Sequence, residues 1–308
     1  MIISASRRTD IPAFYAEWFM QRIRAGYCTV PNPFNRNQVS TISLAPEDVD
    51  AIVFWTRFPR PLLPHLDELD RRGYRYYFQF TLLDYPRSLE THRPDVRQAV
   101  EAFRTLAERI GPERVIWRYD PILLSEELDA AYHRRQYAAL AHALSGSTRR
   151  SVISLVDLYA KARRRLEQPG QPPLVDKQAW AGDPAFGDFI RFLADTALSR
   201  GMEITSCAET IDLRPYGIRP GKCVDDDLLR RLFGIDVPAK KDPSQRPQCS
   251  CALSRDIGAY NTCLFGCQYC YATAGFEAAR RRYARHDPSA AYLGAERERP
   301  GIAETATI

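Results

Sequence analysis

Short apolar segments alternate with amphipathic segments along residues 1–206. The apolar segments are rich in β-branched and aromatic residues, and between them apolar residues recur at helical spacing. This alternation predicts about six strand–helix units built around a parallel sheet. The predicted strands cover residues 2–6, 51–55, 74–82, 114–118, 151–155 and 202–205, and the helices include residues 14–25, 96–110, 129–145 and 186–199.

The predicted units follow one another without a long linker. Short units in unbroken succession favour an α/β fold of the TIM-barrel type, a (β/α) barrel or partial barrel, over an open sheet. We expect residues 1–206 to form this barrel core and residues 207–286 to form a cysteine-rich region packed on its mouth. Residues 168–184 are predicted to be a surface loop, and residues 287–308 a mobile tail.

Polar residues follow every predicted strand at its carboxyl end. In parallel barrels the active site lies at these ends. For a single residue, a helix cap or a turn would be the simpler explanation, but six strand ends together indicate a polar cavity mouth for cofactor and substrate. The residues concerned are Arg7, Arg8, Asp10, Thr56, Arg57, Gln79, Thr81, Arg118, Asp120, Ser154, Asp157, Cys207 and Glu209.

Three cysteines near the C-terminus have the spacing CxxxCxxC: Cys263, Cys267 and Cys270, with Tyr269 directly before the last. Thiolates are the usual protein ligands of iron–sulfur clusters, and such close spacing lets one loop wrap one [4Fe–4S] cluster. Three thiolates leave the fourth iron open to another ligand. A structural zinc site is the alternative, although zinc requires four ligands and no histidine follows at zinc-finger spacing.

The chain contains eight cysteines, and five lie outside this motif. Cys28 is isolated on an apolar segment and is expected to be a buried small hydrophobic residue. Cys207, Cys223, Cys249 and Cys251 lie in the irregular region after the barrel core. Four thiolates complete a closed metal site, so they predict a second centre, either an auxiliary [4Fe–4S] cluster or zinc. Unlinked reduced thiols are the alternative.

Two stretches of the sequence carry a family resemblance. They are Ser-Ala-Ser-Arg-Arg-Thr-Asp-Ile-Pro at residues 4–12 and Asp-Ile-Gly-x-Tyr-x-x-Cys-x-x-x-Cys-x-x-Cys-Tyr-Ala at residues 256–272. Through them the chain resembles the bacterial family known as domain of unknown function 1848, described as having a cysteine cluster like that of radical S-adenosylmethionine (SAM) proteins. Residues 55–57 and 118–121 are also similar to the radical SAM branch that includes spore photoproduct lyase.

The resemblance implies a radical SAM enzyme acting on an unknown substrate. In such enzymes the open iron binds the amino and carboxylate groups of SAM, and one electron from the cluster releases a 5′-deoxyadenosyl radical. Tyr269 would lie beside the adenine, and the strand-end residues Arg118, Glu209, Asp120 and Arg57 are expected to contact SAM. The partner would be an electron donor such as flavodoxin or ferredoxin.

The position of the motif departs from the usual order. In radical SAM barrels CxxxCxxC follows the first strand, whereas here it lies near the C-terminus. A cysteine loop that closes the barrel after residue 260 would make the fold a circularly permuted radical SAM barrel, an order that is tolerated when termini lie close together.

Net charge and hydropathy say little about the binding partners and more about the cellular location. The net charge of +5 neither requires nor excludes an anionic partner, so nucleic acid is not indicated. The arginine runs at residues 163–165 and 280–282 are expected to be solvated helix faces. Because no apolar run is long enough to span a bilayer, we expect a cytoplasmic protein with reduced cysteines and no membrane partner. The other function classes are a barrel with zinc-stapled C-terminal loops and a hydrolytic or binding role, or a non-catalytic iron–sulfur redox or scaffold protein.

Overall fold

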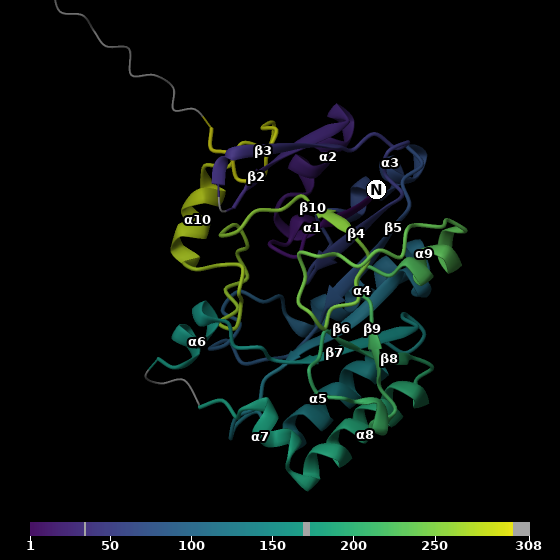
Figure 1. The fold of residues 1–308 in the computed structure, drawn as a ribbon, viewed down its shortest axis with the longest axis vertical. Coiled ribbons are helices and arrows are strands. Elements are labelled where there is room, and N and C mark those ends of the chain that lie inside the picture. The colour runs from purple at the N-terminus through teal and green to yellow at the C-terminus, as the bar shows by residue number, and fades with distance from the viewer. Residues whose placement is uncertain (34, 169–172, 298–308) are drawn as a thin grey trace, which may run out of the picture.

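A parallel sheet of eight strands organises the molecule (Figure 1). The structure is a computed structural model and describes residues 1–33, 35–168 and 173–297. Every neighbouring pair of strands in this sheet is parallel. In spatial order the strands are β10 (Ser254–Asp256), β1 (Ile2–Ala5), β4 (Ala51–Thr56), β5 (Tyr76–Thr81), β6 (Val115–Ile122), β7 (Arg150–Leu155), β8 (Glu203–Cys207) and β9 (Arg219–Gly221).

Apart from β10, the strands that are neighbours in the sheet also follow one another in the sequence. This is the winding of a barrel, because a doubly wound sheet reverses its strand order at a switch point. Among the described residues no strand pairing joins β9 to β10, so this barrel-like sheet is open between them. The predicted α/β class is therefore confirmed. The prediction missed β9 and β10, which have three residues each and no apolar pattern.

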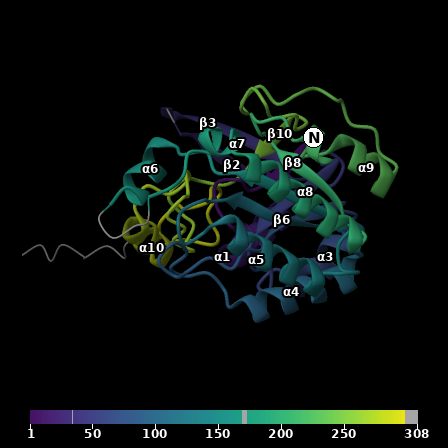
Figure 2. The ribbon, with the colours of Figure 1, turned by 90° about the horizontal axis from the view of Figure 1, so that it is seen from below.

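Helices connect the strands and cover one face of the sheet. In Figure 2, α3, α4 and α5 lie along this face, and α9 lies on the other side. No described helix has the length and apolar character needed to cross a lipid bilayer. The described α-helices are α1 (Ile11–Phe14), α2 (Ala16–Ala25), α3 (Leu66–Arg71), α4 (Val96–Ile110), α5 (Ala130–Ala143), α6 (Ala160–Leu166), α7 (Lys177–Ala181), α8 (Pro184–Ser199), α9 (Asp226–Phe233) and α10 (Phe276–Ala284).

Both faces of the central strands are buried, which explains their nearly continuous apolar sequences. Side chains alternate between the two faces along each strand. Phe54, Phe78 and Trp117 pack with the helices in the larger core. Their neighbours Val53 and Tyr77 belong to a second core on the opposite face.

The second core is completed by the cysteine-rich region. Leu228 and Leu229 of α9 pack there together with Cys223, Cys249 and Cys251. All five residues are buried. This region therefore supplies the covering layer for one face of the sheet.

The segment after α10 is anchored as far as it is described. The indole of Trp18 donates to the carbonyl oxygen of Ala290 at 3.0 Å, and Arg22 donates to that of Ser289 at 2.8 Å. Leu293 is buried. The tail predicted to be mobile from residue 287 is thus folded up to residue 297, because α2 binds its backbone carbonyls, a contact that composition does not reveal. Residues 298–308 lie outside the described residues.

One other predicted segment contains more regular structure than we expected. The surface loop predicted at residues 168–184 contains α7, while its residues 169–172 lie outside the described part. Outside the large sheet, β2 (Tyr27–Asn32) and β3 (Asn35–Ser43) form a separate antiparallel pair.

Candidate metal and cofactor cavity

The carboxyl ends of the strands open on a cavity of about 1230 Å³. All the cysteines predicted to bind metal line it: Cys207, Cys223, Cys249, Cys251, Cys263, Cys267 and Cys270. So do most of the predicted strand-end residues, namely Arg7, Arg8, Asp10, Thr56, Arg57, Thr81, Arg118, Asp120, Ser154 and Asp157. The structure thus brings distant parts of the sequence to one polar site, but Gln79 and Glu209 are not in its lining.

Asp256, the last residue of β10, joins the two stretches that carry the family resemblance. Its carboxylate accepts hydrogen bonds from the hydroxyls of Ser4 at 3.1 Å and Ser6 at 2.7 Å, and from the backbone amide of Arg7 at 2.8 Å. It also accepts from the amide of Gly258 at 3.0 Å. The strand that leads into CxxxCxxC is therefore fixed beside β1.

The CxxxCxxC loop is held by cations on its carbonyl oxygens. Arg165 of α6 donates to the carbonyl oxygens of Gln268 at 2.8 Å and Thr273 at 2.9 Å, and also to that of Cys270. Arg282 of α10 donates to the carbonyl oxygen of Tyr260 at 3.3 Å. We expected both arginine runs to be solvated helix faces. For Arg165 and Arg282 this prediction is wrong, because carbonyl oxygens of the loop and of the chain beside it accept their hydrogen bonds.

A second segment of chain holds the loop from the other side. The amide of Gln268 donates to the carbonyl oxygen of Leu89 at 2.8 Å, and that of His92 donates to Phe265 at 2.9 Å. These bonds bring Glu90 beside Cys267. Glu90 was not predicted as a site residue, since its only sequence signal is one acidic side chain in a segment without regular structure.

Arg57, Glu90 and Tyr269 form a buried network next to Cys267. Arg57 donates from Nη1 to the Tyr269 hydroxyl at 2.9 Å and lies 3.5 Å from the Cys267 sulfur. Its Nη2 donates to Glu90 at 2.8 Å, and the Tyr269 hydroxyl also donates to Glu90. The Nε of Arg57 is buried and has no partner within the described chain. The network fixes the ring of Tyr269 at the cavity wall.

Burial makes the thiols of Cys263 and Cys267 poor acids unless a cation binds them. It raises the pKa of Cys263 well above its ordinary value, with the nearby Cys270 and Cys267 adding to the effect. Burial also raises the pKa of Cys267 to about 12, although the charge of Arg57 opposes this. A metal-bound cysteine is a thiolate, so metal binding would reverse these shifts. Three half-buried cysteines beside a guanidinium with an unused donor fit a site for an anionic iron–sulfur cluster.

Arg118 faces the other cysteine group. Its Nη1 donates to the Cys223 sulfur at 2.8 Å, and its Nη2 pairs with Asp120. The predicted SAM residue Glu209 accepts from Lys177 at 2.9 Å and from the amide of Leu155 at 2.9 Å. In the described chain neither Arg118 nor Glu209 has a bond to the CxxxCxxC loop. Glu209 instead fastens β7 to α7, through a lysine from the segment predicted to be a loop.

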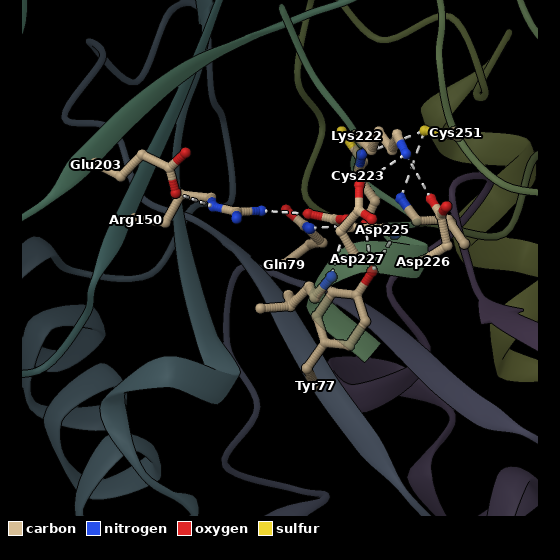
Figure 3. Close-up of polar contacts among 12 residues, drawn as sticks. Tyr77, Gln79, Arg150, Glu203, Lys222, Cys223, Asp225, Asp226, Asp227 and Cys251 are labelled. Atoms are coloured by element: carbon tan, nitrogen blue, oxygen red, sulfur yellow. Dashed lines mark hydrogen bonds and ion pairs between the residues drawn. The ribbon is translucent and has the colours of Figure 1, made fainter. Parts of the chain in front are cut away.

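An acidic cluster lies at the start of α9 (Figure 3). Asp225 caps the helix and pairs with Arg150 at 2.7 Å. Asp226 and Asp227 pair with Lys222 at 2.7 Å and 3.1 Å. Since each carboxylate has a cation, the cluster is a structural element that positions the residues preceding α9.

A family model described as Domain of unknown function (DUF1848) matches residues 2–272. The chain belongs to this family. The matched part begins in β1 and ends just after Cys270, so it contains Asp256, its partners and every cysteine of the cavity. A comparison with curated proteins gave no match. The family description names no reaction, so the chemistry must be argued from the cavity itself.

Proposed function

We propose that this protein is a radical SAM enzyme whose [4Fe–4S] cluster is held by Cys263, Cys267 and Cys270. The observation that carries the proposal is the position of these thiols, on a loop directly after an edge strand, at the carboxyl ends of a barrel-like sheet. When bound and reduced, such a cluster supplies one electron to the sulfonium of SAM.

The strand order supports this proposal. Because β10 pairs with β1, the sheet read in space begins with the strand that leads into CxxxCxxC and continues β1, β4, β5, β6. This is the order expected of a radical SAM barrel in which the first strand has been moved to the end of the chain. The displaced motif therefore does not argue against the function.

The size of the cavity also supports it. Pockets for one small ligand are typically about 300–1000 Å³, and this cavity has about 1230 Å³. It has room for a cluster, SAM and part of a substrate together. The substrate is not specified by the lining, which offers both arginines and carboxylates.

The residues of the chain have distinct roles in this proposal. Arg57 places a positive charge beside Cys267, and Glu90 holds that guanidinium in place. Tyr269 presents its ring to the cavity for stacking on the adenine of SAM. Asp120 is proposed as an acceptor for SAM across the same cavity. Arg118 lines this cavity too and pairs with Asp120, whereas Glu209 is bonded to Lys177 outside the lining. A small electron-transfer protein such as flavodoxin or ferredoxin would reduce the enzyme.

Production of 5′-deoxyadenosine tests the proposal. Protein reconstituted anaerobically with iron and sulfide, then reduced with dithionite, is expected to convert SAM to 5′-deoxyadenosine. Alanine at Cys263, Cys267 or Cys270 should abolish the product, while Cys28→Ala, which removes a buried cysteine that does not line the cavity, should retain it. Fully iron-loaded wild type that leaves SAM intact would contradict the proposal. Zinc without iron in the purified protein would favour a zinc-stabilised barrel instead.

A further inference from the structure

Four cysteines from three parts of the chain meet at the floor of the cavity, apart from the CxxxCxxC loop. Cys207 ends β8, Cys223 precedes α9, and Cys249 and Cys251 precede β10. The sulfurs of Cys207 and Cys223 are 3.1 Å apart. The Cys251 sulfur accepts from the amides of Cys223 at 3.3 Å and Val224 at 3.4 Å. All four line the cavity, and Cys223 and Cys251 are each only 2% exposed.

The backbone that carries these thiols is fixed from below by polar side chains of the sheet. Tyr77 and Gln79 of β5 donate to the carbonyl oxygen of Cys223 at 2.6 Å and 2.9 Å, as Figure 3 shows. The amide of Asp225 donates back to the Tyr77 hydroxyl at 3.1 Å. Two buried polar side chains of the sheet thus position one cysteine. Supports of this kind are typical of metal ligands, whose orientation depends on a second layer of hydrogen bonds.

Two guanidinium groups, the buried Arg118 and the half-buried Arg7, lie beside the four thiols. Arg118 donates to the Cys223 sulfur at 2.8 Å, and Arg7 lies on the same ring of Trp55, with the two cations 5.2 Å and 5.0 Å from its centroid. The Nη2 of Arg7 is buried without a partner in the described chain. Asp120 compensates part of the charge of Arg118, and thiolates beside the two guanidinium groups would stabilise them further.

The spread of the four sulfurs bears on the kind of metal centre, while the 3.1 Å between Cys207 and Cys223 is shorter than either zinc or a cluster would set. Around one tetrahedral zinc ion with Zn–S bonds of about 2.3 Å, neighbouring sulfurs lie about 3.8 Å apart. Within the described residues no three cysteine sulfurs lie within 4.8 Å of one another. The four thiols are therefore spread over a wider volume than a single ion would gather.

We propose that Cys207, Cys223, Cys249 and Cys251 bind a second metal centre, a four-thiolate iron–sulfur cluster whose negative charge is compensated by Arg7 and Arg118. The four thiolates close this centre, so none of its irons is left for SAM. The inference does not rest on the proposed SAM chemistry, because its ligands are separate from CxxxCxxC.

The test measures the iron that remains bound when the ligands of the first centre have been removed. The triple variant Cys263→Ala/Cys267→Ala/Cys270→Ala, reconstituted anaerobically, is expected to retain about four irons per chain and broad absorbance near about 400 nm. After reduction it should give an electron paramagnetic resonance signal that SAM does not change. Converting Cys207, Cys223, Cys249 and Cys251 to serine in this background should remove iron and signal, with circular dichroism confirming that the variant is folded. The same substitution at Cys28 should change neither.

Each outcome of this test is informative. A folded triple variant without metal would overturn the proposal, and one zinc per chain without iron would replace the cluster with a structural zinc site. Because the variant lacks CxxxCxxC, the result is independent of whether the wild type cleaves SAM.

The midpoint potential of the second centre tests the role of Arg118. In the triple variant, Arg118→Gln should make the midpoint potential of the remaining cluster more negative, because a nearby positive charge favours the reduced, more anionic form. Arg118→Lys should restore most of the change. A potential that is the same in all three proteins would remove Arg118 from the assigned role, even if the cluster is present.

Discussion

Gly258 lies where the chain leaving β10 passes β1. A Cβ atom at this position would be 2.0 Å from the hydroxyl oxygen of Ser6 and 2.5 Å from its Cβ. Ser6 cannot turn away without losing its bond to Asp256. The absence of a side chain at one residue thus allows the two strands to share the Asp256 carboxylate.

Gly258→Ala is therefore expected to displace the start of the cysteine loop. Overpacking of this kind costs about 1–3 kcal/mol, so iron bound per chain should fall and the thermal midpoint should decrease. Gly275→Ala is the matched control, because its nearest new contact is 3.8 Å away. Equal iron content and thermal midpoints in the two variants would show that the close approach to Ser6 does not matter.

Arg165 is the second residue on which the loop depends. Arg165→Ala removes the three hydrogen bonds to the carbonyl oxygens around Cys270, and each charged hydrogen bond contributes about 1.5–3 kcal/mol. We expect lower iron occupancy after reconstitution and faster proteolysis near residues 263–273. Arg164→Ala, at an exposed position on the same helix, should resemble the wild type. Iron titration and limited proteolysis would measure the difference between the Arg165→Ala and Arg164→Ala variants.

At this scale the sequence predicted most of the residues that line the cavity but not their pairings. The cysteines and the polar strand ends could be predicted because spacing and strand polarity are local properties. The partners of Arg118, Glu90 and Arg165 could not, because each depends on a segment that is distant in the chain. Arg118 was expected near SAM, and it lies against Cys223 because the covering layer brings that residue under β6.

The helix α5 carries a buried histidine that should make the stability of the fold depend on pH. His133 donates from Nε2 to the carbonyl oxygen of Leu123 at 2.7 Å and accepts from the Tyr119 hydroxyl at Nδ1 at 2.8 Å. These bonds suit the neutral ring. Burial lowers its pKa to about 4, although the bond to Leu123 opposes this.

The free energy of unfolding should rise with pH, because the unfolded chain binds a proton at His133 more readily than the folded chain does. Between about pH 4 and pH 6.5 the unfolded chain binds a proton at His133 and the folded chain does not, so stability rises with pH through this window. The contribution is on the order of 3 kcal/mol above pH 6.5 and is lost on acidification. Urea unfolding across this range should show it in wild type and in His142→Gln, but not in His133→Gln. An unchanged pH slope in His133→Gln would contradict the assignment.

Helices and strands with a strong apolar periodicity were predicted well, whereas short polar strands were not. Residues 96–110 were predicted as a helix with the bounds that α4 has, since its apolar face repeats over four turns and its ends have clear stop signals. The three residues of β9 and of β10 have no apolar alternation. They are strands only because β8 and β1 present free edges to them, which is information that belongs to the assembled sheet.

For the whole molecule, the two proposed centres would connect the open edges of the sheet. Cys207 and Cys223 flank β9, whereas Cys249 to Cys270 flank β10. Anything that binds only the folded state stabilises it in proportion to its affinity and concentration. Metal binding should therefore protect these two edge strands more than the centre of the sheet.

Hydrogen exchange with and without metal checks this expectation. Removing metal with a chelator should speed exchange at residues 219–221 and 254–256 and leave β5 nearly unchanged. The quadruple variant of the second cysteine group should show the faster exchange around β9 even when the first centre is loaded. Uniform loss of protection across all strands would indicate global unfolding and would argue against a local link between the edges.

The pairing of β10 with β1 also has a consequence for how the protein is made. The residues that meet there, such as Ser4 and Asp256, are 252 positions apart. At about 5–20 residues per second of synthesis, β1 waits many seconds for its outer neighbour, with one row of backbone groups unpaired. An unpaired edge is a site for pairing with other chains. The nascent chain is therefore most exposed to aggregation just before residues 254–270 emerge from the ribosome, and iron can be inserted into the CxxxCxxC loop only after these residues have been made.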